Sequence, residues 1–586
     1  MLHRSAYLAD ALTDEKKRRE KAEAYWKAPI SLYMQEALEK CPQLCTSDIF
    51  AFQDYVRQHP PQAVYDRYKN QSGLEEFDPP KCNERAAKLR QAGNKWYGQK
   101  NYKEALIKYN ESICCACADS EDLGIGFANR SAVFYDLREY EFALENIRLA
   151  RQNNYPARLS SKLEARELNC RMRIEAEGRD FRKALNVELN VEANPSIPCL
   201  AKGVGIGEFP LYGRGMKAEQ DFKVGDVILR ESPAVVAVDT RYKFQACHHC
   251  ASDNGLSLIP CPHCVSVMYC NEECLANGWK ECHRFECGIK DKLSIVPFGT
   301  YSVGLTLMFY GLTHFNDSVD DMMNYCKEND RSGSDPFSLD YNNPLDIFKL
   351  YHTAKIKSLS PLMNALNRFV TAILYDIYLK HPLVRSLFVG ENQRNFLLQA
   401  MDDYMIMAAK MNTGIRNPST CELFPRASIC NHSCDPNTHV VYRAGQIKII
   451  VVRPINKGEQ ICIPYGFVKG GVSESDRFGL MATLDFCCVC QVCAPNSKQM
   501  KPNKDQRLQH RSFYRDLRLL TEILENETSN NLDMINASQQ FIQRYANGLL
   551  SGEPNELMAK ILLDYRDVLQ KMFVADVLYE LRRKLN

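Results

Sequence analysis

Cysteine and histidine residues occur in four closely spaced pairs between residues 247 and 287. Two or three residues separate the members of each pair, so one turn of chain can present two donors to a single tetrahedral Zn²⁺. Scattered reduced thiols would not readily produce four such pairs in about 40 residues. Eight ligands predict two closed zinc sites, which are structural because no coordination position is left for water activation. The pairs are Cys247 with Cys250, Cys261 with Cys264, Cys270 with Cys274, and His283 with Cys287.

A third group of ligands is divided between two distant segments. Within the stretch CCVCQVC at 487–493, the last three cysteines form a tight CxCxxC set of three thiols, and the stretch NHSCDPN at 431–437 supplies one more. The alternative for the second stretch is a His–Cys nucleophilic pair, but residues two apart on a strand or turn rarely face each other as that chemistry requires. We therefore predict a third tetrahedral zinc that pins a C-terminal flap to the earlier segment. Its ligands are Cys434, Cys488, Cys490 and Cys493.

The bulk composition describes a globular intracellular chain. It has 586 residues, 45% of them hydrophobic, which predicts several domains with buried cores. Lys and Arg total 74 against 72 for Asp and Glu, so no global basic field favours nucleic acid or membrane. No apolar run reaches 18 residues, and DEKKRREK begins at residue 14, where a signal peptide would need apolar residues. We expect a cytoplasmic and nuclear location, where 25 cysteines serve as buried thiols or metal ligands rather than disulfides.

An internal repeat occupies residues 84 to about 170. Gly93, Trp96, Tyr102 and Ala105 recur 38 residues later as Ser131, Phe134, Tyr140 and Ala143. The pattern resembles tetratricopeptide repeats, in which small residues let paired helices approach. One interpretation is a plain helical spacer.

The second interpretation of the repeats is a peptide clamp. Members of the repeat family that bind the C-terminal carboxylates of heat-shock chaperones place basic and Asn residues at set positions on the concave face. A spacing of four puts two such residues on one helix face, where charge-assisted bonds to a carboxylate can form. The matching positions here are Arg90, Asn94, Asn129, Lys162 and Arg166.

The paired ligands of 247–287 resemble the MYND zinc finger, including the aromatic residue before Cys270 and Trp279 between the last pairs. In that family the pairs interleave. The resemblance therefore implies that the first and third pairs hold one ion and that the second and fourth pairs hold the other. Cys282 is surplus to both sites. MYND fingers generally dock peptides, so a docked peptide is an implied partner.

Three further motifs resemble the SET domain of protein-lysine methyltransferases: NHSCDPN, the downstream GEQICIPYG with Tyr465, and the CxCxxC tail. A MYND finger inserted in a SET domain is typical of the SET and MYND subfamily, and the preceding repeats resemble the branch that carries them. The resemblance covers about residues 84 to 495. It implies an α+β multidomain fold, with a SET β-fold split by the finger and a helical insert and flanked by tetratricopeptide-like helical domains.

The resulting domain prediction runs along the whole chain. It consists of a helical N-terminal region (1–80), tetratricopeptide repeats (81–192), the first part of the SET domain (193–246), the MYND finger (247–287), a helical insert (288–415), the second part of the SET domain (416–470), a post-SET zinc flap (471–496) and C-terminal helices (497–586).

The resemblance also implies a site for S-adenosylmethionine and a lysine substrate. Tyr465 is implied as the catalytic residue that positions methyl and amine, although an ordinary half-buried strand tyrosine remains the alternative. The cofactor contacts would come from Gly213, Arg214 and Gly215 of the YGRGM turn, from Tyr404, Asn412, Asn431 and His432, from Tyr465 itself, and from Phe486, which would stack on the adenine.

One residue departs from the family pattern. Family members commonly carry Tyr two residues before the position of Phe486, whereas this chain has Leu484. Leucine keeps a lysine channel apolar but removes a hydroxyl that could steer the amine. The sequence therefore supports two functions, a methyltransferase and a weakly active or inactive scaffold. A sequence-specific DNA-binding role is disfavoured, because the finger segment mixes charge signs and offers no basic recognition helix.

Overall fold

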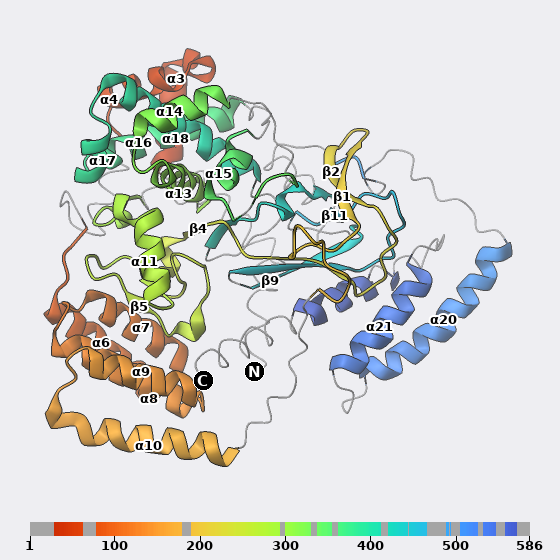
Figure 1. Ribbon diagram of the computed structural model, residues 1–586, viewed down its shortest axis with the longest axis horizontal. Helices are drawn as coiled ribbons and strands as arrows, with labels where there is room; N and C mark the ends of the chain where they lie inside the picture. Colours follow the sequence, from red (N-terminus) through yellow and green to blue (C-terminus); the bar gives the residue numbers. More distant parts are fainter. Residues whose placement is uncertain are drawn as a thin grey trace.

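The computed structural model combines helical units with small β-sheets (Figure 1). It describes residues 29–61, 78–177, 189–293, 299–329, 337–340, 342–353, 361–411, 420–443, 445–465, 488–490, 493, 504–525, 531–546, 557–558 and 560–570. The predicted α+β class is confirmed. No helix within these ranges is long and apolar enough to cross a lipid bilayer.

Five helices form the repeat region. They pack as two hairpins, α6 with α7 and α8 with α9, followed by a fifth helix along α8 and α9. Polar caps mark the starts of α7 and α8: the side chain of Asn101 accepts the amide of Glu104, and that of Ser120 accepts the amide of Leu123. The helices are α6 (Asn83–Gly98), α7 (Tyr102–Cys115), α8 (Glu121–Asp136), α9 (Tyr140–Gln152) and α10 (Ser160–Glu177).

The N-terminal helices belong to the same hydrophobic core as the helical insert. Phe52 packs edge-on against Phe369 with ring centroids 4.8 Å apart, and Gln53 donates a 2.9 Å hydrogen bond to Asp376. One apolar core thus contains residues that lie more than 300 positions apart in sequence. The helices are α3 (Pro29–Lys40) and α4 (Ile49–Gln58), then α13 (Gly299–His314), α14 (Val319–Glu328), α15 (Pro344–His352), α16 (Pro361–Tyr378), α17 (Pro382–Leu387) and α18 (Glu391–Met411).

The strands outside the finger lie between the helical units and form four small sheets (Figure 1). The three-stranded sheet has the order β3-β10-β9, in which β9 and β10 form the hairpin expected from the alternating HVVYRAGQIKIIVV stretch. The pairs β1-β2 and β4-β7 are antiparallel, and β8-β11 is parallel. The strands are β1 (Val204–Phe209), β2 (Gly213–Ala218), β3 (Val227–Glu231), β4 (Val235–Val238), β7 (Thr420–Leu423), β8 (Asn431–His432), β9 (Thr438–Arg443), β10 (Gln446–Val451) and β11 (Cys462–Ile463).

The C-terminal helices cover one face of the three-stranded sheet. Val227, Val441 and Ile450 of the sheet share a core with α20 (Lys504–Glu525), α21 (Asn531–Tyr545) and the helical residues 560–570. Gln570 adds a two-way contact: its side chain accepts the backbone N–H of Tyr442 and donates to the backbone carbonyl of the same residue. The C-terminal helices are therefore attached to the sheet through both apolar packing and the strand backbone.

The repeats and the cysteine-rich finger share one core. Finger elements β5 (Ile259–Pro260), β6 (Met268–Tyr269) and α11 (Glu272–Glu281) sit against the repeat helices, and Phe127 and Ile113 of the repeats pack in a cluster with Leu258 and Met268 of the finger. In Figure 1 the finger lies between the orange repeat helices and the green helical insert. The two modules are thus one folded unit.

Arg130 fastens this shared core. Its side chain is fully buried and donates at 2.6 Å to Asn146 Oδ1, to Asn110 Oδ1 and to the carbonyl of Leu258 in the finger. Burial lowers the pKa of the Arg130 guanidinium. The cation is retained because its hydrogen bonds replace those to water.

Replacing Arg130 tests this attachment. Arg130→Ala would leave two amide oxygens and one carbonyl without their buried donor, so we expect a loss of about 3 kcal/mol in the free energy of unfolding. Urea denaturation followed by the fluorescence of Trp96 and Trp279 measures it. Arg158→Ala is the control, because the side chain of Arg158 is 63% exposed and pairs only with Glu121 at the surface. Equal stability of the two variants would contradict this role for Arg130.

Candidate active site and metal centres

The eight paired ligands of the finger gather into two groups. In each group the ligand atoms lie within 4.8 Å of one another, and the first pair joins the third while the second joins the fourth, as the MYND resemblance implies. The groups are Cys247, Cys250, Cys270 and Cys274, and Cys261, Cys264, His283 and Cys287.

Local structure explains this interleaving. The backbone N–H of His248 donates to the carbonyl of Met268 in β6 at 2.9 Å, and the sulfurs of Cys250 and Cys270 beside this contact lie 3.5 Å apart. The side chain of Asn271 then accepts the amide of Cys274 at 2.8 Å and starts α11, which turns that thiol inward. Cys282 lies outside both groups, buried in the core of the helical insert, where burial raises the pKa of its thiol. The structure thus agrees that Cys282 is surplus to both ligand groups and places it in the core of the insert.

A third group brings Cys434 to the distant CxCxxC stretch. The sulfur of Cys434 lies 3.6 Å from that of Cys493 and 3.9 Å from that of Cys488, and Cys490 completes a set whose members lie within 4.8 Å. Tyr212, in the turn between β1 and β2, lies near this group. Burial and the neighbouring cysteines raise its pKa. Three Cys/His sets suited to tetrahedral Zn²⁺ are thus present among the described residues.

The parallel pair β8-β11 brings NHSCDPN together with Tyr465. Asn431 lies opposite Cys462 and His432 opposite Ile463. Two residues beyond β11, the backbone N–H of Tyr465 donates to His432 Nδ1 at 3.0 Å, and its hydroxyl donates to the carbonyl of Cys430 at 2.8 Å. The tyrosine hydroxyl is therefore held in a defined position by the segment that also carries Asn431 and His432.

The GRG turn meets the same segment from β2. The side-chain amide of Asn431 donates to the carbonyl of Arg214 at 3.1 Å. Gly213 has φ +73°, which favours glycine at the start of β2. A Cβ at Gly215 would lie 2.5 Å from the side-chain nitrogen of Asn431 and 2.8 Å from that of Gln460. A larger residue at Gly215 would therefore have to displace these two side chains. The structure brings six of the predicted cofactor residues together: Gly213, Arg214, Gly215, Asn431, His432 and Tyr465.

His432 is nearly fully buried, and its ring is engaged on both sides. Nδ1 accepts from the amide of Tyr465, which leaves Nε2 as the protonated nitrogen of a neutral ring, and Nε2 lies 3.3 Å from the sulfur of Cys434. With both ring nitrogens engaged, any hydrogen bond from His432 to a cofactor falls to its main chain.

The remaining predicted cofactor residues lie elsewhere or outside the described ranges. Tyr404 is buried in the core of the helical insert, where its hydroxyl lies 3.0 Å from His352 Nδ1 and its ring packs near Phe348. Those contacts make it a core residue of the insert and do not join it to Asn431. Asn412, Leu484 and Phe486 lie outside the described residues.

The predicted clamp residues all lie on α6, α8 and α10. Asn94 accepts hydrogen bonds from Tyr109 and from Asn129, which joins the first two of these helices. Arg90 forms a 2.5 Å ion pair with Asp122. Arg166 donates to the carbonyl of Ala128 and to Ser131, and Lys162 is exposed. Two of the three basic side chains are therefore already engaged within the repeats.

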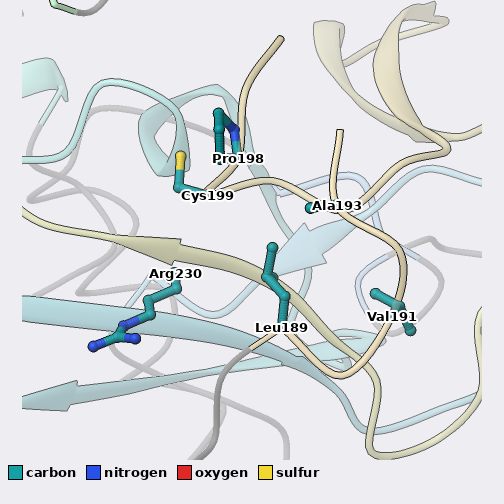
Figure 2. Close-up of a pocket in the computed structure, with 6 residues that line it drawn as sticks. All are labelled: Leu189, Val191, Ala193, Pro198, Cys199 and Arg230. Carbon is teal, nitrogen blue, oxygen red and sulfur yellow. The ribbon is translucent and has the colours of Figure 1, made fainter. Parts of the chain in front are cut away.

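A shallow cavity of about 370 Å³ lies apart from these residues (Figure 2). It is lined by residues of the segment before β1 and by one residue of β3, and in Figure 2 the side chain of Arg230 runs along the sheet away from that segment. None of the predicted site residues lines it. Its lining residues are Leu189, Val191, Ala193, Pro198, Cys199 and Arg230.

Comparison with known proteins agrees with this geometry. The SET domain family matches residues 213–466, a range that begins at the GRG turn, ends just after Tyr465 and encloses the finger and the helical insert. The chain contains a SET domain. The first and last parts of the candidate site therefore lie about 250 residues apart in sequence, with the finger and the helical insert between them.

Whole-chain relatives extend the resemblance beyond the SET domain. The protein-lysine N-methyltransferase SMYD4 of Danio rerio is 25% identical over 521 residues, covering 73% of this chain and 68% of the relative. The Homo sapiens protein of the same name is 23% identical, covering 70% and 67%. The histone-lysine N-methyltransferase ASHR1 of Arabidopsis thaliana is 26% identical, covering 50% and 55%. The resemblance to the SET and MYND methyltransferases, and to their fourth member, is confirmed.

Two features of the SET site were missed from the sequence. The side-chain nitrogen of Gln460 is buried next to Gly215 and has no hydrogen-bond partner among the described residues, and the carbonyl of Cys430 holds the tyrosine hydroxyl. Gln460 lies in the quoted GEQICIPYG stretch, whose first residues were read only as a family signature. No sequence signal marks Cys430, because a backbone carbonyl is common to every residue.

The metal content of the third group can be tested by one substitution. We expect Cys434→Ser to lower the zinc content from three to two ions per chain, because serine does not replace a thiolate ligand of Zn²⁺. Metal analysis of the purified protein gives the count, and Cys430→Ser is the matched control because Cys430 is buried outside every metal group. Three ions retained in Cys434→Ser would contradict the predicted ligand set.

Proposed function

We propose that this chain is an S-adenosylmethionine-dependent protein-lysine N-methyltransferase whose reacting groups meet beside Tyr465. The observation that most directly supports this proposal is the position of the Tyr465 hydroxyl. It donates to the carbonyl of Cys430, next to β8 and the GRG turn. The SET domain and the methyltransferases among the relatives support this reaction class.

The residues around Gly215 fit the cofactor. Gly215 leaves the backbone of β2 free of side-chain bulk, and within the described part of the chain the buried side-chain nitrogen of Gln460 has no hydrogen-bond partner. An unpaired buried donor is costly unless a ligand or water satisfies it, so a polar ligand at this place is physically favoured. Gly213, Arg214, Gly215 and Asn431 would hold the cofactor, with Phe486 stacking on its adenine.

The protein must also supply an uncharged amine. A lysine with a pKa of about 10.4 is neutral only about once in 2,500 molecules at pH 7. An apolar channel disfavours the ammonium form and lowers the pKa of the substrate amine. When bound, S-adenosylmethionine supplies a methyl group on a positively charged sulfur. The hydroxyl of Tyr465, held in place by the carbonyl of Cys430, would position the amine for transfer.

The three metal groups would be structural. Each offers four protein ligands, which would complete the tetrahedral shell of Zn²⁺. Two ions would support the finger, and the third would join the CxCxxC stretch to the strand that carries Asn431 and His432. Metal binding would therefore stabilise the fold around the site rather than take part in methyl transfer.

The repeats and the finger would select the partner. A chaperone C-terminal peptide on α6, α8 and α10 and a peptide docked on the finger remain proposals, as does a cytoplasmic and nuclear location. The ion pair of Arg90 with Asp122 would have to open before Arg90 could bind a peptide carboxylate. The protein substrate is accordingly proposed as the main partner, with the chaperone contact secondary.

Binding and transfer can be separated with Tyr465. Removal of one hydroxyl in Tyr465→Phe should leave the Kd for S-adenosylmethionine within about threefold but lower methyl transfer about 100-fold, because positioned side-chain groups typically contribute 10²–10⁴. Calorimetric titration measures the first, and mass spectrometry of methyl-lysine in cellular proteins measures the second. Tyr97→Phe, which removes a hydroxyl bonded to Asp136 on the repeats, is the control. No binding of the cofactor by the wild-type protein would refute the proposal.

The alternative function is a weakly active scaffold, and Leu484 is the observation that favours it. A leucine lacks the hydroxyl that most family members place in the lysine channel. If this absence limits the rate, Leu484→Tyr should raise methyl transfer by about tenfold or more while the Kd for the cofactor stays constant. The same mass-spectrometric assay compares the variants, with Leu484→Phe as the control for aromatic bulk. No gain in any substrate protein would leave the channel tyrosine without a role here.

A further inference from the structure

We propose that His432 is a positioning residue that transmits the state of the third metal group to Tyr465. This inference rests on the proposed function, because it concerns how the candidate active site is held in register. The ring of His432 lies between the two features, with one nitrogen directed at each.

The first contact is to a metal ligand. His432 Nε2 lies 3.3 Å from the sulfur of Cys434, one of the four thiols of the third group. A zinc-bound cysteine is a thiolate, which accepts a hydrogen bond better than a neutral thiol does. Groups that donate to metal ligands orient them, and their loss commonly costs 10–100-fold in metal affinity or activity.

The second contact is to the tyrosine backbone. His432 Nδ1 accepts the amide of Tyr465 at 3.0 Å, and the two rings lie with centroids 5.3 Å apart. A neutral imidazole has one donor and one acceptor nitrogen. The acceptor role toward Tyr465 therefore fixes the donor role toward Cys434, so the two contacts belong to one tautomer.

Both residues of the first contact are shielded from water. His432 is only 3% exposed, and Cys434 is fully buried. Zinc bound by the third group fixes the sulfur of Cys434, the sulfur fixes the ring, and the ring fixes the backbone of Tyr465. Loss of that ion would release the ring and loosen the start of the segment that presents the tyrosine hydroxyl to Cys430.

Two substitutions separate the contacts. In His432→Asn the side-chain oxygen falls near the place of Nδ1 and can still accept the Tyr465 amide, but nothing reaches Cys434. In His432→Gln the amide nitrogen falls near the place of Nε2 and can still donate to Cys434, but the acceptor for Tyr465 is lost. A residue with a merely structural role would show equal losses in both variants.

Two readouts report the two contacts. Release of zinc to a chromophoric chelator reports the third group, with the two finger ions as internal controls. Hydrogen exchange of the peptide that contains Tyr465, followed by mass spectrometry, reports the amide. We expect about tenfold faster release of one ion in His432→Asn with exchange unchanged. We expect about tenfold faster exchange in His432→Gln with release unchanged.

Transmission itself is tested with Cys493→Ser, which removes a ligand that does not touch His432. Exchange of the Tyr465 amide should rise about tenfold in Cys493→Ser. It should not rise further when Cys493→Ser is added to His432→Asn, where the asparagine holds the amide without help from the metal group. Two bound ions in Cys493→Ser show that only the third group has been lost.

The proposal is overturned if Cys493→Ser leaves exchange at Tyr465 unchanged, if the two His432 variants lose both properties together, or if the wild-type chain binds only two ions. These outcomes do not depend on methyl transfer. Failure of the wild-type protein to bind S-adenosylmethionine would refute the proposed function while leaving the exchange result to decide the role of His432.

Discussion

The short parallel pairing of β8 with β11 holds the two halves of the candidate active site together. It sets Asn431 and His432 beside the chain that continues into Tyr465, and two hydrogen bonds from Tyr465 back to His432 and Cys430 extend the register. Two residue pairs form a small pairing, so its geometry depends on its surroundings. Asn437 supplies part of this support, donating to the Gln460 carbonyl and accepting the Cys462 amide.

Buried polar contacts also fix how the modules are joined to one another. Arg130 ties the repeats to the finger, and Glu286 accepts from both Lys290 and Tyr378 where the finger meets the helical insert. Such groups are costly to bury unless paired, and their directional bonds fix one docking arrangement where apolar packing alone would tolerate several. The finger is consequently enclosed by neighbours on two sides, and the repeats that would recruit a partner are rigidly connected to it.

The third cysteine group serves the site rather than the finger. It joins residues separated by more than 50 positions and places the CxCxxC stretch beside His432. A metal ion is well suited to this task, because coordination bonds hold a short segment that has too little apolar surface to pack by itself. The candidate site is thereby supported both by β2 and by the third cysteine group.

The sequence alone determined the features that depend on local spacing. Close ligand pairs predicted the finger sites, and the CxCxxC stretch, which lacks a fourth ligand, pointed to Cys434. The β9-β10 hairpin and the helical repeats could likewise be predicted from local patterns. The family motifs added the Asn431, His432 and Tyr465 set, which the structure brings into contact.

Tertiary structure decided what depends on contacts between distant residues. The N-terminal helices share the core of the helical insert, and Tyr404 lies in that core rather than beside Asn431. Arg90 pairs with Asp122, and Gln460 lies beside Gly215. No periodicity or spacing encodes such partners, because each depends on which surfaces meet after the chain has folded. The physical reason is that spacing reports the reach of a few residues, whereas burial and hydrogen-bond pairing are properties of the assembled core.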